Sequence, residues 1–279
     1  MTAHFLQLCF ALGSMPTQCL ASVGTLIPKA KKGNRQIAAL PSLYRVAIKH
    51  EREVLQDWEA KYAHPAFSFQ SGQNCLHRVF VQAARAEMAT SSTSTKASTG
   101  MVLFDMSNYY EGIDRNKLQK CHEQTGFPGP AATLSLRQYR AKRYLQLGHI
   151  AAKIGHPTKG ILPGCGVATY HVQSYSGPSL SEYMTDHPDL EVNCHVDDLA
   201  ISATAVQEMQ VVHRLRAGSR DLRALVEEDL GCSIADEKTE VVGSSFALKR
   251  KIRYAIGLQD STARADPPAP LQHQPRAPP

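Results

Sequence analysis

With 279 residues, 43% of them hydrophobic and 20% charged, the chain can bury the core of one large domain or two small ones, and this composition excludes a disordered protein. Its seven cysteines are odd in number and include no Cys-x-x-Cys pair, which argues against a disulfide framework or a zinc site and indicates a reducing compartment inside the cell. Nucleus and cytoplasm are not distinguished. The apolar opening "HFLQLCFALG" is too short to cross a bilayer, so we expect no membrane partner.

The net charge of +6 conceals a segregation of charge along the chain. No acidic residue precedes Glu51 or falls between Gln124 and Ser181, although both stretches carry several lysines and arginines. Fourteen of the twenty-five acidic residues fall within 182–240. This pattern favours a surface that binds a polyanion beside an acidic centre that holds metal ions. On charge alone, chance clustering of solvated side chains is an equal alternative.

The predicted elements begin after a low-complexity stretch. Residues 90–100, "TSSTSTKASTG", are predicted to be a flexible linker. The apolar run "MVLFD" (101–105) predicts a buried strand. Asp114 is placed to cap a helix that runs to Thr125, where Gly126 supplies a stop.

The second half of the chain continues this order. Residues 131–147 carry leucines and tyrosines at helical spacing among basic residues, which predicts an amphipathic helix with one cationic face. "GILPGCG" (160–166) is a turn that opens a further helix. "LEVNCHV" and "LAISATA" predict two strands joined at a tight turn, and "KTEVVGS" predicts a last strand after a helix over 205–230. The proline-rich residues 261–279 are predicted to be a disordered tail.

These elements define a fold class. Between residues 101 and 244 the order is strand, helices, two hairpinned strands, helix and strand. This is the order of an α+β fold with a ferredoxin-like split β-α-β sheet, and we expect its helices on one face.

Three aspartates are predicted to meet in the middle of that sheet. Asp105 ends its first strand, and Asp197 and Asp198 lie at the turn of its hairpin. Because each added charge raises the pKa of the other carboxyls, such a cluster needs strong cations. Two Mg²⁺ or Mn²⁺ ions satisfy this need and support phosphoryl transfer. A surface turn with two solvated acids is the alternative for an Asp-Asp pair taken alone.

Residues 26–245 resemble the reverse transcriptase domain of non-LTR (LINE-like) retrotransposons. "VLFDMSNYYEGIDRNKL", "KGILPGCGVATYHVQSY", "CHVDDLAISA" and "DEKTEVVGS" are similar to that family's motifs A, B, C and D, in this order. "LIPKAKKGNRQIAALPSLYRV" is similar to its fingers segment. The chain departs from the family's pattern at Gln36, Pro163 and His195.

The resemblance implies a domain organisation. It implies a polymerase palm over 101–260, partial fingers over 26–89 after an N-terminal segment (1–25), and a truncated element whose thumb is missing. It implies an RNA-directed DNA polymerase that takes an RNA template, a DNA primer and deoxynucleoside triphosphates. The main alternative is a catalytically inactive nucleic-acid-binding remnant, and an unrelated two-metal phosphohydrolase is the third.

The resemblance also assigns the metal site. Asp105 and Asp197 would bind two ions, Asp198 would complete the acidic site, and the Met106 carbonyl would add a ligand. Lys238, in motif D, would protonate the departing pyrophosphate as a general acid; an exposed lysine without a role is the alternative.

The remaining roles concern the substrates. Tyr110 falls where the family places the aromatic that excludes a 2′-hydroxyl, and an ordinary core tyrosine is the alternative. The cations expected to hold the incoming triphosphate are Lys31, Lys32 and Arg35. Gly160 and Gly164 would let the backbone approach the template–nucleotide pair.

Overall fold

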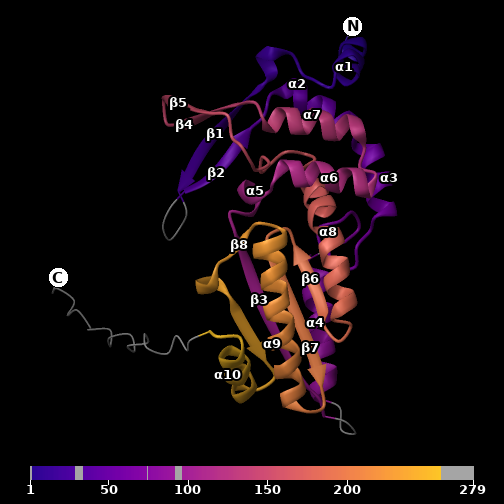
Figure 1. Cartoon of the computed structure of the whole chain (residues 1–279), viewed down its shortest axis with the longest axis vertical. Coiled ribbons are helices and arrows are strands. Elements are labelled where there is room, and N and C mark those ends of the chain that lie inside the picture. The colour runs from indigo at the N-terminus through magenta and orange to yellow at the C-terminus, as the bar shows by residue number, and fades with distance from the viewer. Residues whose placement is uncertain (1, 29–33, 74, 92–95, 259–279) are drawn as a thin grey trace, which may run out of the picture.

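The computed structural model describes residues 2–28, 34–73, 75–91 and 96–258. It contains two sheets, one towards each end of the molecule (Figure 1). The first has the order β2-β1-β4-β5, and the second has the order β6-β7-β3-β8, with β9 also paired to β3. The strands are β1 (Ala21–Pro28), β2 (Asn34–Ala39), β3 (Ser98–Ser107), β4 (Lys142–Leu147), β5 (Ile150–Gly155), β6 (Glu191–His195), β7 (Asp198–Ala205), β8 (Ser233–Ile234) and β9 (Glu240–Gly243).

Helices surround both sheets. The α-helices are α1 (Thr2–Ala11), α2 (Ser42–His50), α3 (Arg52–Lys61), α4 (Cys75–Ser91), α5 (Tyr109–Gly112), α6 (Arg115–Thr125), α7 (Gly129–Tyr139), α8 (Ala168–Asp186), α9 (Glu208–Ala224) and α10 (Phe246–Ala255). Short turns of other helix types are η1 (Thr17–Cys19), the π-helical η2 (Leu225–Asp229) and η3 (Asp236–Lys238). No helix in the described ranges is both long and apolar enough to span a bilayer.

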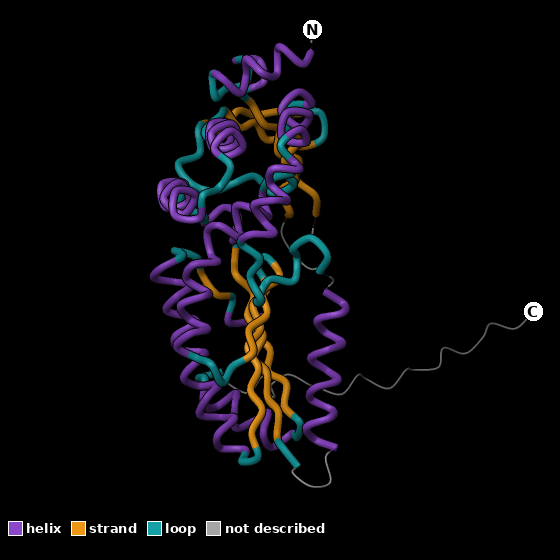
Figure 2. Tube along the Cα trace, turned by 90° about the vertical axis from the view of Figure 1, so that its right-hand side faces the viewer, coloured by secondary structure: helices purple, strands orange, loops and turns teal. Residues whose placement is uncertain are grey.

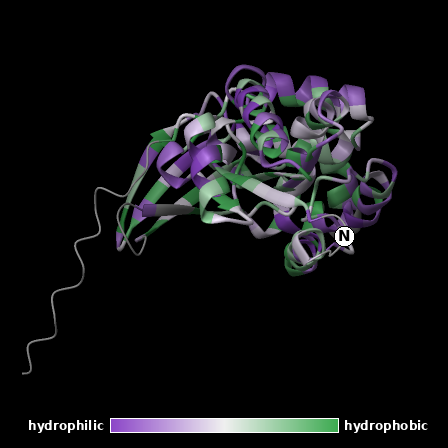
Figure 3. Ribbon diagram, turned by 90° about the horizontal axis from the view of Figure 1, so that it is seen from below, coloured by the Kyte–Doolittle hydropathy of each residue, from purple (hydrophilic) through white to green (hydrophobic). Residues whose placement is uncertain are grey.

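The second sheet is built around β3. Its buried residues alternate along the strand, with Val102, Phe104 and Met106 on one face. That face packs against α9 and α10, and a Cβ added to Gly100 would lie 2.5 Å from Cδ1 of Ile252. Seen from below, hydrophobic residues concentrate on the strands and hydrophilic ones on the outer helices (Figure 3).

The sheet has helices on both faces, so the expectation of helices on one face is wrong. Figure 2 shows α4 along one side of the sheet, opposite to the side that α9 covers. Gln82 of α4 donates to the hydroxyl of Ser202 (3.3 Å), and Arg85 pairs with Glu191 (2.9 Å). The helix covers the face that carries Met101 and Leu103, which the strand alternation leaves without the cover of α9.

Several predicted elements are confirmed. The Asp114 carboxylate accepts hydrogen bonds from the amides of Asn116 and Lys117 at the start of α6, and Gly126 ends that helix with a φ of 59°. The order of strand, helices, hairpin, helix and strand is also confirmed. The fold is α+β, as expected.

Two boundaries differ from the prediction. Residues 131–147 are not one helix, because α7 ends at Tyr139 and Lys142–Leu147 form β4, which pairs in parallel with β1. The first strand of the palm starts at Ser98, within the stretch predicted to be a linker, because Ser98–Asp105 pair with β7. Residues 92–95 of that stretch, and the tail from 259, lie outside the described residues.

Candidate active site

Asp105 and Asp198 are direct partners across the two central strands. The antiparallel register of β3 and β7 runs from the Ser98–Ala205 pair to the Asp105–Asp198 pair. The amide of Met106 then donates to the carbonyl of Asp197 (2.9 Å). The end of β3 is therefore bonded to the turn that carries the second and third aspartates.

That turn has an unusual backbone. Val196 and Asp197 form the two-residue loop between β6 and β7, and Val196 has a φ of 62°. A β-branched residue at positive φ is a conformational outlier that costs about 1–3 kcal/mol. Strand pairing in the surrounding sheet offsets this cost. As a result, Asp197 and Asp198 lie at the end of the central strands, beside Asp105.

The electrostatics of the site reflect the nearness of the three carboxylates. Partial burial raises the pKa of Asp198, and the charges of Asp197 and Asp105 raise it further. His195 and Lys238 act in the opposite direction. Negative charge at this edge is therefore unfavourable without additional cations.

Lys238 supplies one such cation. The carbonyl of Asp105 accepts a hydrogen bond from the amide of Ala235 (2.9 Å), which places η3 beside the end of β3. From η3, the Nζ of Lys238 donates to Oδ1 of Asp105 (2.6 Å), and this hydrogen bond raises the pKa of Lys238. The carboxylate and the motif D lysine are thus an ion pair.

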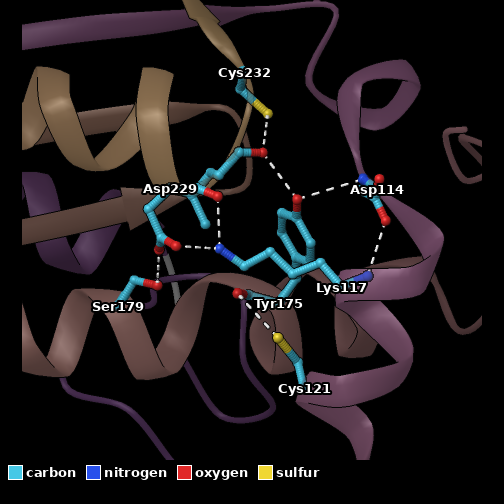
Figure 4. A network of polar contacts seen from close by, with 8 residues as sticks. Asp114, Lys117, Cys121, Tyr175, Ser179, Asp229 and Cys232 are labelled. Atoms are coloured by element: carbon cyan, nitrogen blue, oxygen red, sulfur yellow. Dashed lines mark hydrogen bonds and ion pairs between the residues drawn. The ribbon is translucent and has the colours of Figure 1, made fainter.

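A polar network holds the segment that precedes Lys238 (Figure 4). Lys117 of α6 pairs with Asp229 at the end of η2, and Ser179 of α8 donates to the same carboxylate. Tyr175 donates from its hydroxyl to the carbonyl of Leu230 (2.8 Å). Because β8 begins three residues later and pairs with Met106 and Ser107, the network fixes one edge of the site against α6 and α8.

The next question is whether the carboxylates of the site are arranged to hold a metal ion. Among the described residues, no group of three or more His, Cys, Asp or Glu side chains is arranged to hold one. The ammonium of Lys238 instead lies on Asp105, the position that a divalent cation would share. Carboxylate oxygens are suitable ligands for Mg²⁺, so an ion bound by Asp105 would have to displace this ammonium.

Tyr110 and Gly160 lie on the helical side of the site. Tyr110 is half-buried on α5, and its burial, followed by the charges of Asp197 and Glu111, raises its pKa to about 12. Gly160 donates to the Ile113 carbonyl (2.8 Å), and a Cβ there would lie 2.9 Å from Cα of Glu111. The close approach that Gly160 allows is therefore an approach to α5.

Gly164 lines a separate cleft of 270 Å³ beside α2. Arg45 and Lys49, four residues apart on one face of α2, line the same cleft, together with Arg52 at the start of α3. Lys31 and Lys32 lie outside the described residues, and of Arg35 only the backbone, paired with Ile27, is described.

Sequence reasoning missed Ser68 as a neighbour of the site. Its hydroxyl lies 3.0 Å from Nδ1 of His195, at the end of β6. Ser68 follows an isolated bridge between Phe67 and Cys194, so a segment of the predicted fingers extends the palm sheet at this edge. No local signal in the sequence indicates this contact.

No protein-family model matches the chain, and no curated protein matches it in sequence. Solved structures do match. The apo telomerase of Candida tropicalis, truncated from its C-terminal domain, has a TM-score of 0.57 and 13% identity, over 82% of this chain and 51% of that one. The Candida tropicalis telomerase in complex with the TWJ fragment of telomeric RNA has a TM-score of 0.60 and 14% identity, over 88% and 44%.

The Candida albicans telomerase in complex with the TWJ fragment of telomeric RNA also matches, with a TM-score of 0.54 and 11% identity, over 87% of this chain and 45% of that one. The chain thus spans about half the length of the telomerases that it resembles. At these identities the similarity establishes the fold, which is a reverse-transcriptase-like palm fold.

Proposed function

We propose that the chain is an RNA-directed DNA polymerase domain derived from a non-LTR retrotransposon. The observation that carries the proposal is the Asp105–Asp198 pair at the centre of a reverse-transcriptase-like sheet, with Asp197 bonded to the next residue of β3. Function requires a site as well as a fold, and this pair supplies the carboxylates that phosphoryl transfer needs.

In this proposal the three aspartates and the Met106 carbonyl would hold two Mg²⁺ or Mn²⁺ ions. Bound ions of this kind activate the attacking hydroxyl and stabilise the leaving oxygen. Lys238 would release Asp105 in the loaded site and would donate its proton to the departing pyrophosphate. Its ion pair with Asp105 keeps it at the site, and the raised pKa of Lys238 keeps it charged.

The substrates are an RNA template, a DNA primer and deoxynucleoside triphosphates. Lys31, Lys32 and Arg35 hold the triphosphate. Tyr110, whose pKa is raised in part by the charge of Asp197, excludes the 2′-hydroxyl of a ribonucleotide. The cations of the α2 cleft bind phosphates of the nucleic acid, next to Gly164. The RNA complexes of the two similar telomerases support an RNA partner.

The test is extension of a DNA primer on an RNA template with Mg²⁺ or Mn²⁺. Asp197→Asn removes a charged ligand and keeps the size of the side chain, so extension is expected to fall by orders of magnitude while folding and RNA binding persist. Asp189→Asn, at an exposed position, is the matched control and retains activity. Equal extension by the wild type and Asp197→Asn would exclude the assignment.

The second candidate is a nucleic-acid-binding remnant without activity. The Lys238–Asp105 ion pair favours it, because a permanent ammonium at this position would replace a metal ion. Absence of extension by the wild type, together with intact and salt-sensitive RNA binding, would support the remnant.

A further inference from the structure

A cleft of 560 Å³ lies behind the candidate active site. Phe104 of β3 and Thr239 line it, and these residues are the chain neighbours of Asp105 and Lys238. Successive side chains of a strand point to opposite faces, so the cleft is on the α9 face, away from the Asp105 carboxylate. Its volume falls in the range of roughly 300–1,000 Å³ that is typical of small-molecule sites.

The walls of this cleft are apolar, and its rim is cationic. Ala217, Ala255, Ile256 and Leu258 line it together with Phe104. Its charged lining residues, within the described part of the chain, are all basic and belong to α9: Arg216, Arg220 and Arg223.

The three arginines differ in their partners. Arg220 pairs with Asp221 (2.8 Å), and Arg223 pairs with Glu227 (3.0 Å) and with Asp236. Arg216 is exposed and has no carboxylate within ion-pair distance among the residues that the structure describes. Its guanidinium is therefore available to an anion that enters the cleft.

Ser219 gives an independent sign of a ligand. It lines the cleft and is only 6% exposed, yet its hydroxyl has no hydrogen-bond partner in the described structure. A buried hydroxyl without a partner costs about 1–3 kcal/mol, and such a group in a folded protein indicates a missing water, ion or ligand.

We propose that this cleft binds a small organic anion, an apolar ring body that carries a phosphate, as in a nucleoside monophosphate. Arg216 binds the phosphate, the Ser219 hydroxyl provides a further polar contact, and the apolar walls hold the ring. The bound molecule contacts Phe104 and Thr239, which are the chain neighbours of Asp105 and Lys238. This site is distinct from the proposed polymerase site, and its binding does not require polymerase activity.

The test is calorimetric titration of the full chain with adenosine monophosphate in a buffer that contains EDTA, which removes metal-dependent binding elsewhere. Saturable binding is expected, with adenosine and inorganic phosphate each at least tenfold weaker. Absence of saturable binding up to millimolar concentration would overturn the proposal. Equal affinity for inorganic phosphate would also overturn it, because the apolar walls would then contribute nothing.

Variants of the lining residues test whether the ligand binds in this cleft. Arg216→Gln, at an exposed position that folding tolerates, is expected to weaken binding at least tenfold, and Ala217→Phe to abolish it by filling the cleft. Ser219→Ala is expected to weaken binding without lowering the melting temperature, because it removes an unpaired hydroxyl. Arg214→Gln, on the same helix but paired with Asp189 (3.2 Å) outside the cleft, is the control and retains affinity. Unchanged affinity in Arg216→Gln would overturn the assignment, whether or not Ala217→Phe folds.

Discussion

Lys238 and Asp105, 133 positions apart in the chain, form an ion pair with 2.6 Å between Nζ and Oδ1. The two residues that the proposed chemistry needs as a proton donor and a metal ligand are therefore in direct contact with each other. Lys238 offsets part of the negative charge that Asp105 places beside Asp198, and its ammonium would compete with divalent cations for the Asp105 carboxylate.

Lys238→Met tests this competition. Because 55% of the Lys238 side chain is exposed, we expect the loss of the ion pair to lower the free energy of unfolding by less than about 1 kcal/mol. Affinity for Mn²⁺ is expected to rise, since the ion no longer displaces an ammonium. Mn²⁺ binding followed by electron paramagnetic resonance and urea unfolding measure the two effects. Lys251→Met, which breaks a similar exposed pair with Glu208, is the control, and its Mn²⁺ affinity stays at the wild-type level.

Asp198→Asn tests the electrostatic cost of the carboxylate cluster. The pKa of Asp198 is raised in the folded protein, so the folded state binds its proton more tightly than the unfolded chain does. Its contribution to stability therefore falls as the pH rises above the ordinary carboxyl value of about 3.9. We expect Asp198→Asn to stabilise the metal-free protein at pH 7, with a gain that disappears below about pH 4.

Denaturant unfolding in EDTA at the two pH values measures this gain. Asp221→Asn is a control of opposite sign, because the hydrogen bond from Arg220 lowers the pKa of Asp221. Addition of Mg²⁺ is expected to stabilise the wild type more than Asp198→Asn, since only the wild type has the full ligand set. An equal response to Mg²⁺ in both proteins would argue against metal binding at Asp198.

Gly160→Ala and Gly164→Ala separate backbone conformation from packing. Both glycines have a positive φ, of 86° and 85°, so either substitution costs about 1–2 kcal/mol for the left-handed backbone. A Cβ at Gly160 also lies 2.9 Å from the backbone of Glu111, whereas at Gly164 its nearest atom is 3.9 Å away. We expect Gly160→Ala to cost about 1–3 kcal/mol more than Gly164→Ala in urea unfolding. Similar losses in both variants would show that the contact with α5 relaxes without cost.

Arg45→Gln tests the α2 cleft as a phosphate-binding surface. Removal of one phosphate contact is expected to weaken RNA binding for all sequences and to reduce the slope of log K against log salt by about 1. Fluorescence anisotropy with a labelled RNA at several salt concentrations measures both quantities. Lys120→Gln, on α6 and outside this cleft, removes the same charge and is expected to leave the slope unchanged. A slope that is unchanged in Arg45→Gln would place the RNA elsewhere.

The sequence by itself determined the elements that depend on short-range chemistry. The Asp114 cap and the Gly126 stop of α6 follow from side-chain and backbone preferences within a single turn of helix. The hairpin around Asp197 follows from two apolar runs joined at a tight turn, and the order of the elements makes the strand of Asp105 a neighbour of that hairpin. The register that pairs Asp105 with Asp198 comes from the structure. The apolar run 101–105 likewise predicted a buried strand, whereas the alternation of buried residues along β3 is seen only in the structure.

Only the tertiary structure decided the features that depend on distant partners. Lys142–Leu147 were predicted to be helical. They form β4 instead, because β1, more than a hundred residues earlier, has a free edge with which they pair. The cover of α4 over the second face of the palm, and the contact of Ser68 with His195, have the same long-range origin. The Lys238–Asp105 pair arises because β8 and η3 dock beside the end of β3, which no local pattern encodes. Local preferences amount to tenths of a kcal/mol per residue, and pairing and burial across the fold outweigh them.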